Sequence, residues 1–148
     1  MYKHILVATD GSRLSAKAIR TAAQLARTCG AKLTGAYVIA PYSAPVYGEV
    51  VAYAPPMSAQ RYKELVAKEA KKALAAVEIE AQTAGVPFDS VSTTNAQAWR
   101  GIIRVAQARK CDVIVMASHG RRGLRALVYG SQAQGVLTHS TIPTLVYR

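Results

Sequence analysis

Residues 111–131 read CDVIVMASHGRRGLRALVYGS, and this stretch decides the fold. An apolar run from Val113 to Met116 is followed by a polar loop that glycines punctuate, and Ser131 then caps a short predicted helix that reaches about His139. Parallel α/β proteins place anionic ligands at such strand-to-helix connections, because the amide groups at a helix N-terminus point at the ligand. The stretch therefore predicts an α/β fold with a candidate anion site.

Strand and helix patterns alternate along the rest of the chain without a linker, a repeat or a low-complexity tract. Residues 41–56, with four prolines and three tyrosines, should form an irregular loop that is a plausible lid. Five strands and four helices indicate one α/β domain over 1–148, a parallel sheet with helices on both faces. We expect strands over 5–8, 33–40, 88–94, 113–116 and 144–147, and helices over 13–29, 58–84, 96–109 and 131–139.

The first helix should place Ala16, Ile19, Ala23 and Ala26 on its core side and end at Gly30. Two cysteines far apart, without a neighbouring metal-ligand pattern, are interpreted as free buried thiols.

Two of the predicted strands, 5–8 and 113–116, are apolar on both alternating faces, as strands at the centre of a covered sheet must be. Each turns polar at its carboxyl end, the first at Thr9 and Asp10 and the second at Ser118 and His119. If the strand order reverses between them, these ends form the crevice in which open α/β sheets bind ligands. Asp10 could instead serve only in the turn before the first helix, and His119 could be a loop residue without a ligand.

The loop beyond His119 suits a phosphate, because glycines let the backbone approach a ligand closely and Ser131 offers a hydroxyl and helix-start amides. Glycine-rich loops are common, so the spacing alone leaves phosphate binding open. Trp99 is expected to pack between helices rather than to stack on a base, and His4 and His139 to lie away from the crevice. The loop glycines are Gly120, Gly123 and Gly130, and its arginines are Arg121, Arg122 and Arg125.

The composition narrows the class of protein. A hydrophobic fraction of 51% and a mean hydropathy of +0.09 suit a compact core, and no run approaches the roughly 18 apolar residues of a membrane span. The N-terminus is unlike a signal peptide, so we expect a cytoplasmic protein without a membrane partner. The net charge of +11 points to anionic partners. Nucleic acid is the less favoured anionic partner, because no groove-reading motif or aromatic platform is present.

Three segments, KHILVATDGS (3–12), VIVMASHGRRGLRALVYGS (113–131) and TIPTLVYR (141–148), resemble the universal stress protein family, and the likeness covers the whole chain in order. The resemblance implies a Rossmann-like, adenine nucleotide alpha hydrolase-like sheet of order 3-2-1-4-5. One branch of the family binds ATP through Gly, two residues, Gly, nine residues, Gly, then Ser or Thr. Gly120, Gly130 and Ser131 match that pattern, and Ala117 stands at its first glycine.

Ala117 can weaken a nucleotide site in two ways. If its backbone needs a positive φ, the alanine costs about 1–2 kcal/mol, which is about five- to thirtyfold in affinity. If it keeps ordinary strand dihedrals, its methyl matters only where a phosphate or ribose passes within contact distance.

The resemblance implies that Asp10 lies by the ribose or the metal, that Ala8, Thr9 and Val38 line the adenine pocket, and that the 116–119 segment surrounds the nucleotide. Gln132 and Ala133 fall beside the phosphates. The implied nucleotide-binding residues are Ala8, Thr9, Asp10, Val38, Met116, Ala117, Ser118, His119, Gly120, Arg121, Gly130, Ser131, Gln132 and Ala133.

We therefore expect a stress-response protein that binds an adenine nucleotide, ATP with Mg²⁺ first, with cyclic AMP or AMP as alternatives. No catalytic residue is assigned and no side-chain metal cluster is expected, so the protein should be at most a slow ATPase. A homodimer through the terminal strand 144–147 is expected, because an edge strand carries unpaired backbone groups. The alternative is a nucleotide-free dimeric stress protein that acts by protein–protein interaction.

Overall fold

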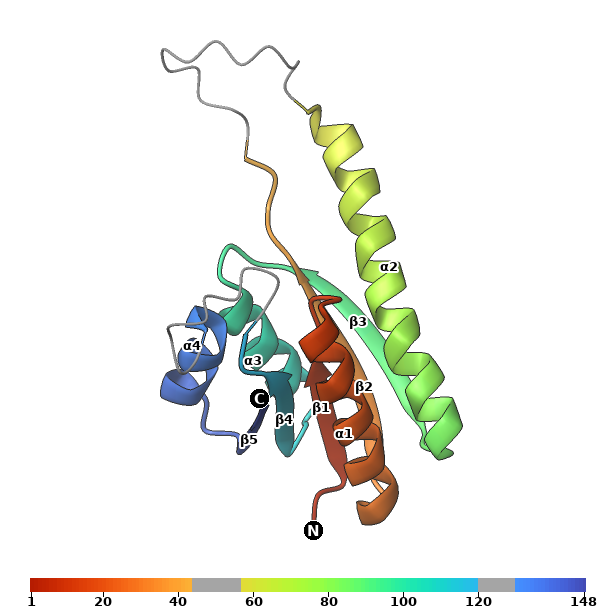
Figure 1. Cartoon of the computed structure of the whole chain (residues 1–148). Coiled ribbons are helices and arrows are strands. Elements are labelled where there is room, and N and C mark those ends of the chain that lie inside the picture. Colours follow the sequence, from red (N-terminus) through yellow and green to blue (C-terminus); the bar gives the residue numbers. More distant parts are fainter. Residues whose placement is uncertain (44–56, 120–129) are drawn as a thin grey trace.

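The computed structural model of the chain describes residues 1–43, 57–119 and 130–148 (Figure 1). These residues form a parallel five-stranded sheet in the order β3-β2-β1-β4-β5. The strand pattern predicted the parallel sheet, and the family resemblance implied its order. The elements are β1 (His4–Ala8), α1 (Arg13–Cys29), β2 (Lys32–Ile39), α2 (Ala59–Ala84), β3 (Phe88–Thr94), α3 (Ala98–Ala108), β4 (Val113–Ala117), α4 (Ser131–His139) and β5 (Thr144–Tyr147).

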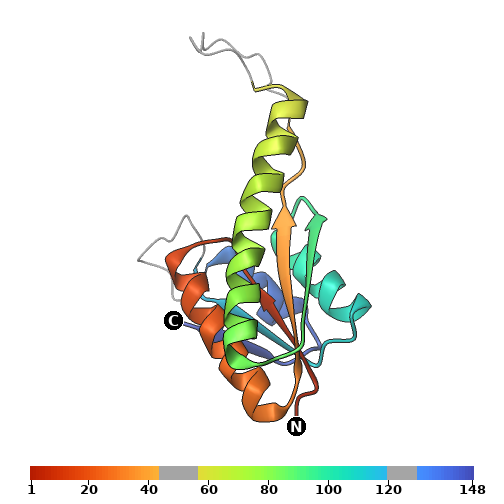
Figure 2. The same cartoon turned by 90° about the vertical axis from the view of Figure 1, so that its right-hand side faces the viewer.

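Helices cover both faces of the sheet, with α1 and α2 on one side and α3 and α4 on the other (Figures 1 and 2). The side chains of β1 alternate between the two layers: Ile5 and Val7 pack toward α1, whereas Leu6 and Ala8 pack toward α3. All four are buried, which explains the unbroken apolar run of this central strand. The edge strand β3 is only partly buried.

Capping residues set the bounds of the helices. Ser12 precedes α1 and its hydroxyl accepts a hydrogen bond from the Ser15 amide, and Ser58 caps α2 in the same way. Gly30 and Gly85 end the two helices with φ of 62° and 67°, a left-handed conformation that glycine adopts without strain.

Three local predictions were wrong. Ala16 is exposed although Ala23, seven residues further on and on nearly the same side of α1, is buried, so this side of the helix is covered only beyond its first turn. Ser131 does not cap α4: Gly130 is the N-cap, and its carbonyl accepts the first intrahelical bond, from the Gln134 amide at 3.0 Å. Cys29 is only half-buried.

Cys111 is a buried free thiol, as predicted. Burial, followed by the negative charge of Asp112, raises the pKa of this thiol to about 11. Cys111 therefore stays a protonated core residue near neutral pH.

Two predicted features lie outside the described residues. Most of the Pro/Tyr loop, residues 44–56, is one, and the segment 120–129 with Gly120, Gly123 and the three arginines is the other. Within the described residues, no helix has both the length and the apolar character needed to cross a membrane.

Candidate functional site

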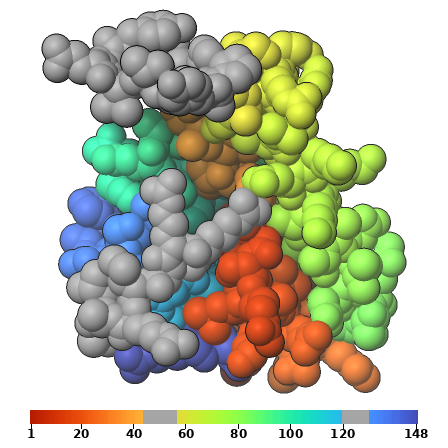
Figure 3. Space-filling model, turned by 45° about the horizontal axis from the view of Figure 1, so that its top comes forward, coloured from red at the N-terminus to blue at the C-terminus, as the bar shows by residue number. Residues whose placement is uncertain are grey.

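The predicted crevice lies where the strand order reverses. The chain runs outward from β1 through β2 to β3 and then returns to β4 on the other side of β1, so β1 and β4 are neighbours, with Val7 paired to Val115. Their carboxyl ends therefore lie side by side at the switch point of the sheet. Figure 3 brings this end of the molecule forward, with α1 (red) between the α4 side (blue) and the α2 side (green).

At the end of β1, Thr9 and Asp10 build the turn that starts α1. Thr9 is 7% exposed, its hydroxyl accepts a hydrogen bond from the Gly11 amide at 3.1 Å, and it lies 3.1 Å from the Ser15 hydroxyl. Asp10 Oδ1 accepts from the Ser12 amide at 3.0 Å, which is the turn role weighed above. Gly11 has a φ of 77°, so this tight turn favours glycine. The Thr9 hydroxyl thus contacts groups of the turn and of α1. Asp10 is half-buried and follows the carboxyl end of β1.

The residues expected to line an adenine pocket share the α3 and α4 face of the sheet. Ala8 and Met116 are 7% and 5% exposed, and both belong to the core cluster on this face. Val38 is half-buried and packs against Gly101 of α3, where an added Cβ would lie 2.7 Å from a Val38 methyl. These three side chains come from the neighbouring strands β1, β2 and β4 and belong to one apolar cluster.

Ala117 is the last residue of β4 and pairs with Tyr147 of β5. Its side chain packs on the opposite face, against the core cluster under α1. Among the described non-glycine residues, only Lys110 has a positive φ, so Ala117 keeps ordinary strand dihedrals. The strain cost considered for this alanine is therefore absent from the structure.

Ser118 connects β4 to the start of α4. Its amide donates to the Tyr147 carbonyl, its own carbonyl accepts from the Gly130 amide, both at 2.7 Å, and its hydroxyl lies 3.0 Å from His119 Nδ1. A Cβ on Gly130 would come within 3.1 Å of the Ser118 carbonyl oxygen, so the close approach favours glycine. The N-terminus of α4 is thereby held directly against the end of β4.

The first turn of α4 carries the remaining predicted residues. Ser131 and Gln132 are exposed, whereas Ala133 is 1% exposed and packs in the core. Ala133 can therefore offer a ligand only its backbone amide. Gln132 Oε1 accepts from the Trp99 amide at 2.9 Å, and Gln132 Nε2 donates to the Ser131 hydroxyl at 3.3 Å.

Trp99 packs between helices, as predicted. Its ring stacks on His139 with centroids 4.3 Å apart, the Arg100 guanidinium lies 5.0 Å from the ring centroid, and a Cβ on Gly135 would come within 2.4 Å of the ring. The link from Gln132 to the Trp99 amide was not predicted. The one signal in the sequence was a glutamine, Gln97, at the N-cap of α3, where Ser, Thr, Asp or Asn would supply an acceptor. It indicates that the first turn of α3 needs an acceptor from elsewhere, but not which residue supplies it.

The structure thus places Ala8, Val38 and Met116 in one apolar cluster with Ala133 of α4, and Asp10 follows the carboxyl end of β1, while Gly120 and Arg121 lie outside the described residues. No group of three or more histidine, cysteine or acidic side chains that could hold a metal ion occurs in the described parts of the chain. A ligand here would meet an apolar face, one carboxylate and a row of amide and hydroxyl donors. That combination suits a nucleotide.

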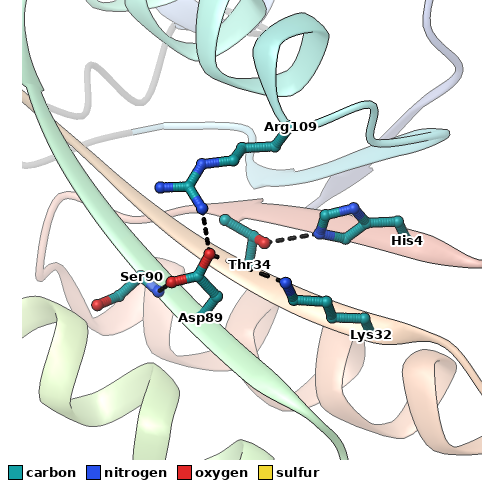
Figure 4. Close-up of polar contacts among 6 residues, drawn as sticks. All are labelled: His4, Lys32, Thr34, Asp89, Ser90 and Arg109. Atoms are coloured by element: carbon teal, nitrogen blue, oxygen red, sulfur yellow. Dashed lines mark hydrogen bonds and ion pairs between the residues drawn. The ribbon is translucent and has the colours of Figure 1, made fainter.

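A second polar cluster lies at the opposite, amino end of the sheet (Figure 4). Asp89 of β3 pairs with Arg109 and lies 3.9 Å from Lys32 Nζ, and its other oxygen accepts from the Ser90 amide. His4 Nε2 lies 2.7 Å from the Thr34 hydroxyl. Burial, then the charge of Lys32, lowers the pKa of His4.

Comparison with known proteins gives relatives along the full chain. The family model described as universal stress protein family matches residues 1–148. A universal stress protein of Methanocaldococcus jannaschii is 30% identical over 100% of this chain and 83% of its own length. Universal stress protein A homolog 1 of Coxiella burnetii is 32% identical over 97% of this chain and 94% of its own length.

Solved structures share the fold. A universal stress protein from Lactobacillus plantarum has a TM-score of 0.78 at 24% identity, covering 99% of this chain and 98% of that one. One from Archaeoglobus fulgidus in complex with dAMP has a TM-score of 0.73 at 19% identity, covering 99% and 98%. A universal stress protein in complex with cAMP has a TM-score of 0.69 at 20% identity, covering 99% and 97%. With a family match from the first residue to the last and the same sheet order, the chain belongs to the universal stress protein family.

Proposed function

We propose that this protein binds an adenine nucleotide, ATP with Mg²⁺ first, in the crevice at the carboxyl ends of β1 and β4. The observation that carries the proposal is the seating of α4, whose N-terminus is fixed on the end of β4 by the 2.7 Å bond from the Gly130 amide to the Ser118 carbonyl. Helix N-termini favour phosphate through their unpaired amides and dipole. Two proteins of similar fold were solved with cAMP and dAMP, which supports an adenine ligand.

Different residues of the crevice are proposed to contact the base, the phosphates and the metal ion. Ala8, Val38 and Met116 offer the apolar surface for the base, and the amides of Ser131 and Gln132 with the Ser131 hydroxyl offer donors for phosphate oxygens. Asp10 supplies a carboxylate, which fits a Mg²⁺ ion that binds through one carboxylate, phosphate oxygens and water. The ion would neutralise phosphate charge, and Asp10 is the side chain proposed to hold it among the described residues.

We propose a sensing or signalling role in the stress response rather than efficient catalysis. Ser118 is 2% exposed, so its hydroxyl does not reach a ligand, and its contact with His119 joins neighbouring residues of the chain. A triad needs a base between an accessible nucleophile and an orienting group. Hydrolysis of bound ATP is therefore proposed to be slow at most.

The edge strand β5 supports the proposed homodimer. It is the outermost strand beside β4, and Leu145 on it is 37% exposed. A second copy of β5 would pair the backbone groups of this edge and cover Leu145. A cytoplasmic location is part of the same proposal.

The test begins with freshly purified protein. Denaturation followed by chromatography of the released small molecules identifies a bound nucleotide, and titration of the stripped protein with Mg-ATP gives its affinity. Saturable binding below millimolar ATP supports the proposal. Absence of both a released nucleotide and saturable binding would favour the nucleotide-free, protein-binding alternative.

A further inference from the structure

The Gln132 side chain joins α3 to the start of α4. Its Oε1 accepts from the Trp99 amide in the first turn of α3, and its Nε2 donates to the Ser131 hydroxyl at the start of α4. A backbone N–H only donates, so the atom facing Trp99 must be the amide oxygen and the atom facing Ser131 must be the amide nitrogen. The orientation of the Gln132 amide is thus fixed by chemistry.

This orientation determines what the Ser131 hydroxyl can do. An oxygen that accepts from Gln132 Nε2 keeps its own hydrogen for another acceptor. Ser131 is the first residue of α4, where the amides of the first turn also lack intrahelical acceptors. Gln132 therefore leaves the Ser131 hydroxyl free to donate, together with the amides of the first turn of α4. A phosphate oxygen accepts hydrogen bonds from such donors.

Packing between α3 and α4 holds the Gln132 side chain in place. Gln97 gives α3 no side-chain cap, so the Trp99 amide takes its acceptor from Gln132. The Trp99 ring lies against Gly135 and stacks on His139, which fixes its backbone relative to α4. The contact that caps α3 is thus the same contact that orients Ser131.

We propose that Gln132 is a positioning residue for the phosphate group, acting through the Ser131 hydroxyl. The inference rests on the proposed function, because it assigns a role within that nucleotide site. It makes a claim that general support of the fold does not: Gln132 contributes to binding of the phosphates and not to binding of the adenosine part.

The test is a double-mutant cycle between positions 131 and 132, read out with two probes. The affinities of adenosine and of ATP are measured by calorimetry for the unmodified protein, Ser131→Ala, Gln132→Met and the double variant. Gln132→Met keeps the side-chain length but neither accepts nor donates. Gln132→Ala, which removes both hydrogen bonds without adding a charge, replaces it in the cycle if thermal unfolding shows that the methionine variant is not folded.

We expect Gln132→Met to weaken ATP binding by about 3- to 12-fold, the range of one hydrogen bond, and to leave adenosine binding unchanged. In the Ser131→Ala background the same substitution should have no further effect on ATP binding. Equal losses for adenosine and ATP, or a loss that persists without the Ser131 hydroxyl, would overturn the positioning role. Unmodified protein that binds ATP no better than adenosine would overturn it as well, whereas binding of neither probe would contradict the proposed function itself.

Discussion

The two ends of the sheet use polar groups in different ways. At the amino end, acidic side chains meet donors from the protein: Asp89 takes Arg109 and Lys32, and Asp112 takes the amides of Lys3 and His4 at 2.7 and 3.2 Å. At the carboxyl end, the first turn of α4 has no side-chain cap. The carboxylates at the amino end have donors within the protein, which stabilises the fold. The amides at the start of α4 have no side-chain acceptor and can donate to a bound anion. The amino end is therefore expected to contribute to stability, and the carboxyl end is the proposed place of binding.

The largest effect is expected from Gly130→Val. An added Cβ would already lie 3.1 Å from the Ser118 carbonyl oxygen, so a valine must push α4 away from the end of β4. A displacement that costs about 2 kcal/mol lowers ATP affinity by about thirtyfold. Calorimetric titration with Mg-ATP measures the loss. The loss should exceed that of Ser131→Ala, which removes one proposed phosphate donor but leaves the backbone in place. A loss no larger than in Ser131→Ala would show that the seating of α4 is not the determinant.

At the other end, Asp89→Asn should lower stability without affecting binding. The substitution weakens the contacts with Arg109 and Lys32, whose side chains are 41% and 45% exposed, so solvent screening limits the cost to about 0.5–1 kcal/mol. Urea unfolding measures the stability, and ATP titration should give an unchanged affinity. A clear loss of ATP affinity in the folded variant would remove the distinction between the two ends.

Acidification should weaken the amino end through His4. The pKa of His4 is lower in the folded protein than its ordinary value of 6.5, so the unfolded chain binds the proton more readily. The contribution of neutral His4 is present above pH 6.5 and is lost as the pH falls through the folded pKa. Unfolding midpoints at pH 7.5 and pH 5 should therefore differ less in His4→Gln than in the unmodified protein. An equal pH dependence in the two proteins would exclude His4 as its source.

Among the variants at the carboxyl end, the smallest effect on binding is expected from Ala117→Gly. Ala117 has ordinary strand dihedrals and its methyl packs toward α1, away from the face of Ala8 and Met116. Glycine should leave ATP affinity within about twofold and lower stability by about 0.5–1 kcal/mol through backbone entropy. Fivefold tighter ATP binding would show instead that this alanine obstructs the nucleotide.

The fold could be predicted from the sequence because the signals that begin and end its helices and strands are local. Ser12, Ser58, Gly30 and Gly85 mark helix ends by their own chemistry, and apolar runs mark β1 and β4 as central strands. Errors arose where the answer depends on tertiary packing or on a distant partner. Ala16 is exposed near the start of α1, whereas Ala23, on nearly the same side of the helix, is buried.

The site shows the same limit. The position of Ala117 in the family pattern left open whether its backbone is strained, because φ and the packed face of that residue appear only in three dimensions. The bond from the Trp99 amide to Gln132 joins residues 33 positions apart, which no sequence pattern encodes.

Amide chemical shifts recorded during a titration with Mg-ATP test the central claim most directly. Binding at the switch point predicts saturable shifts of the Asp10, Gly130 and Ser131 amides, with the Asp89 and Asp112 amides unchanged. Shifts confined to the amino end, or no saturable shift at either end up to millimolar ATP, would contradict the assignment of the carboxyl end of β1 and β4 as a nucleotide site.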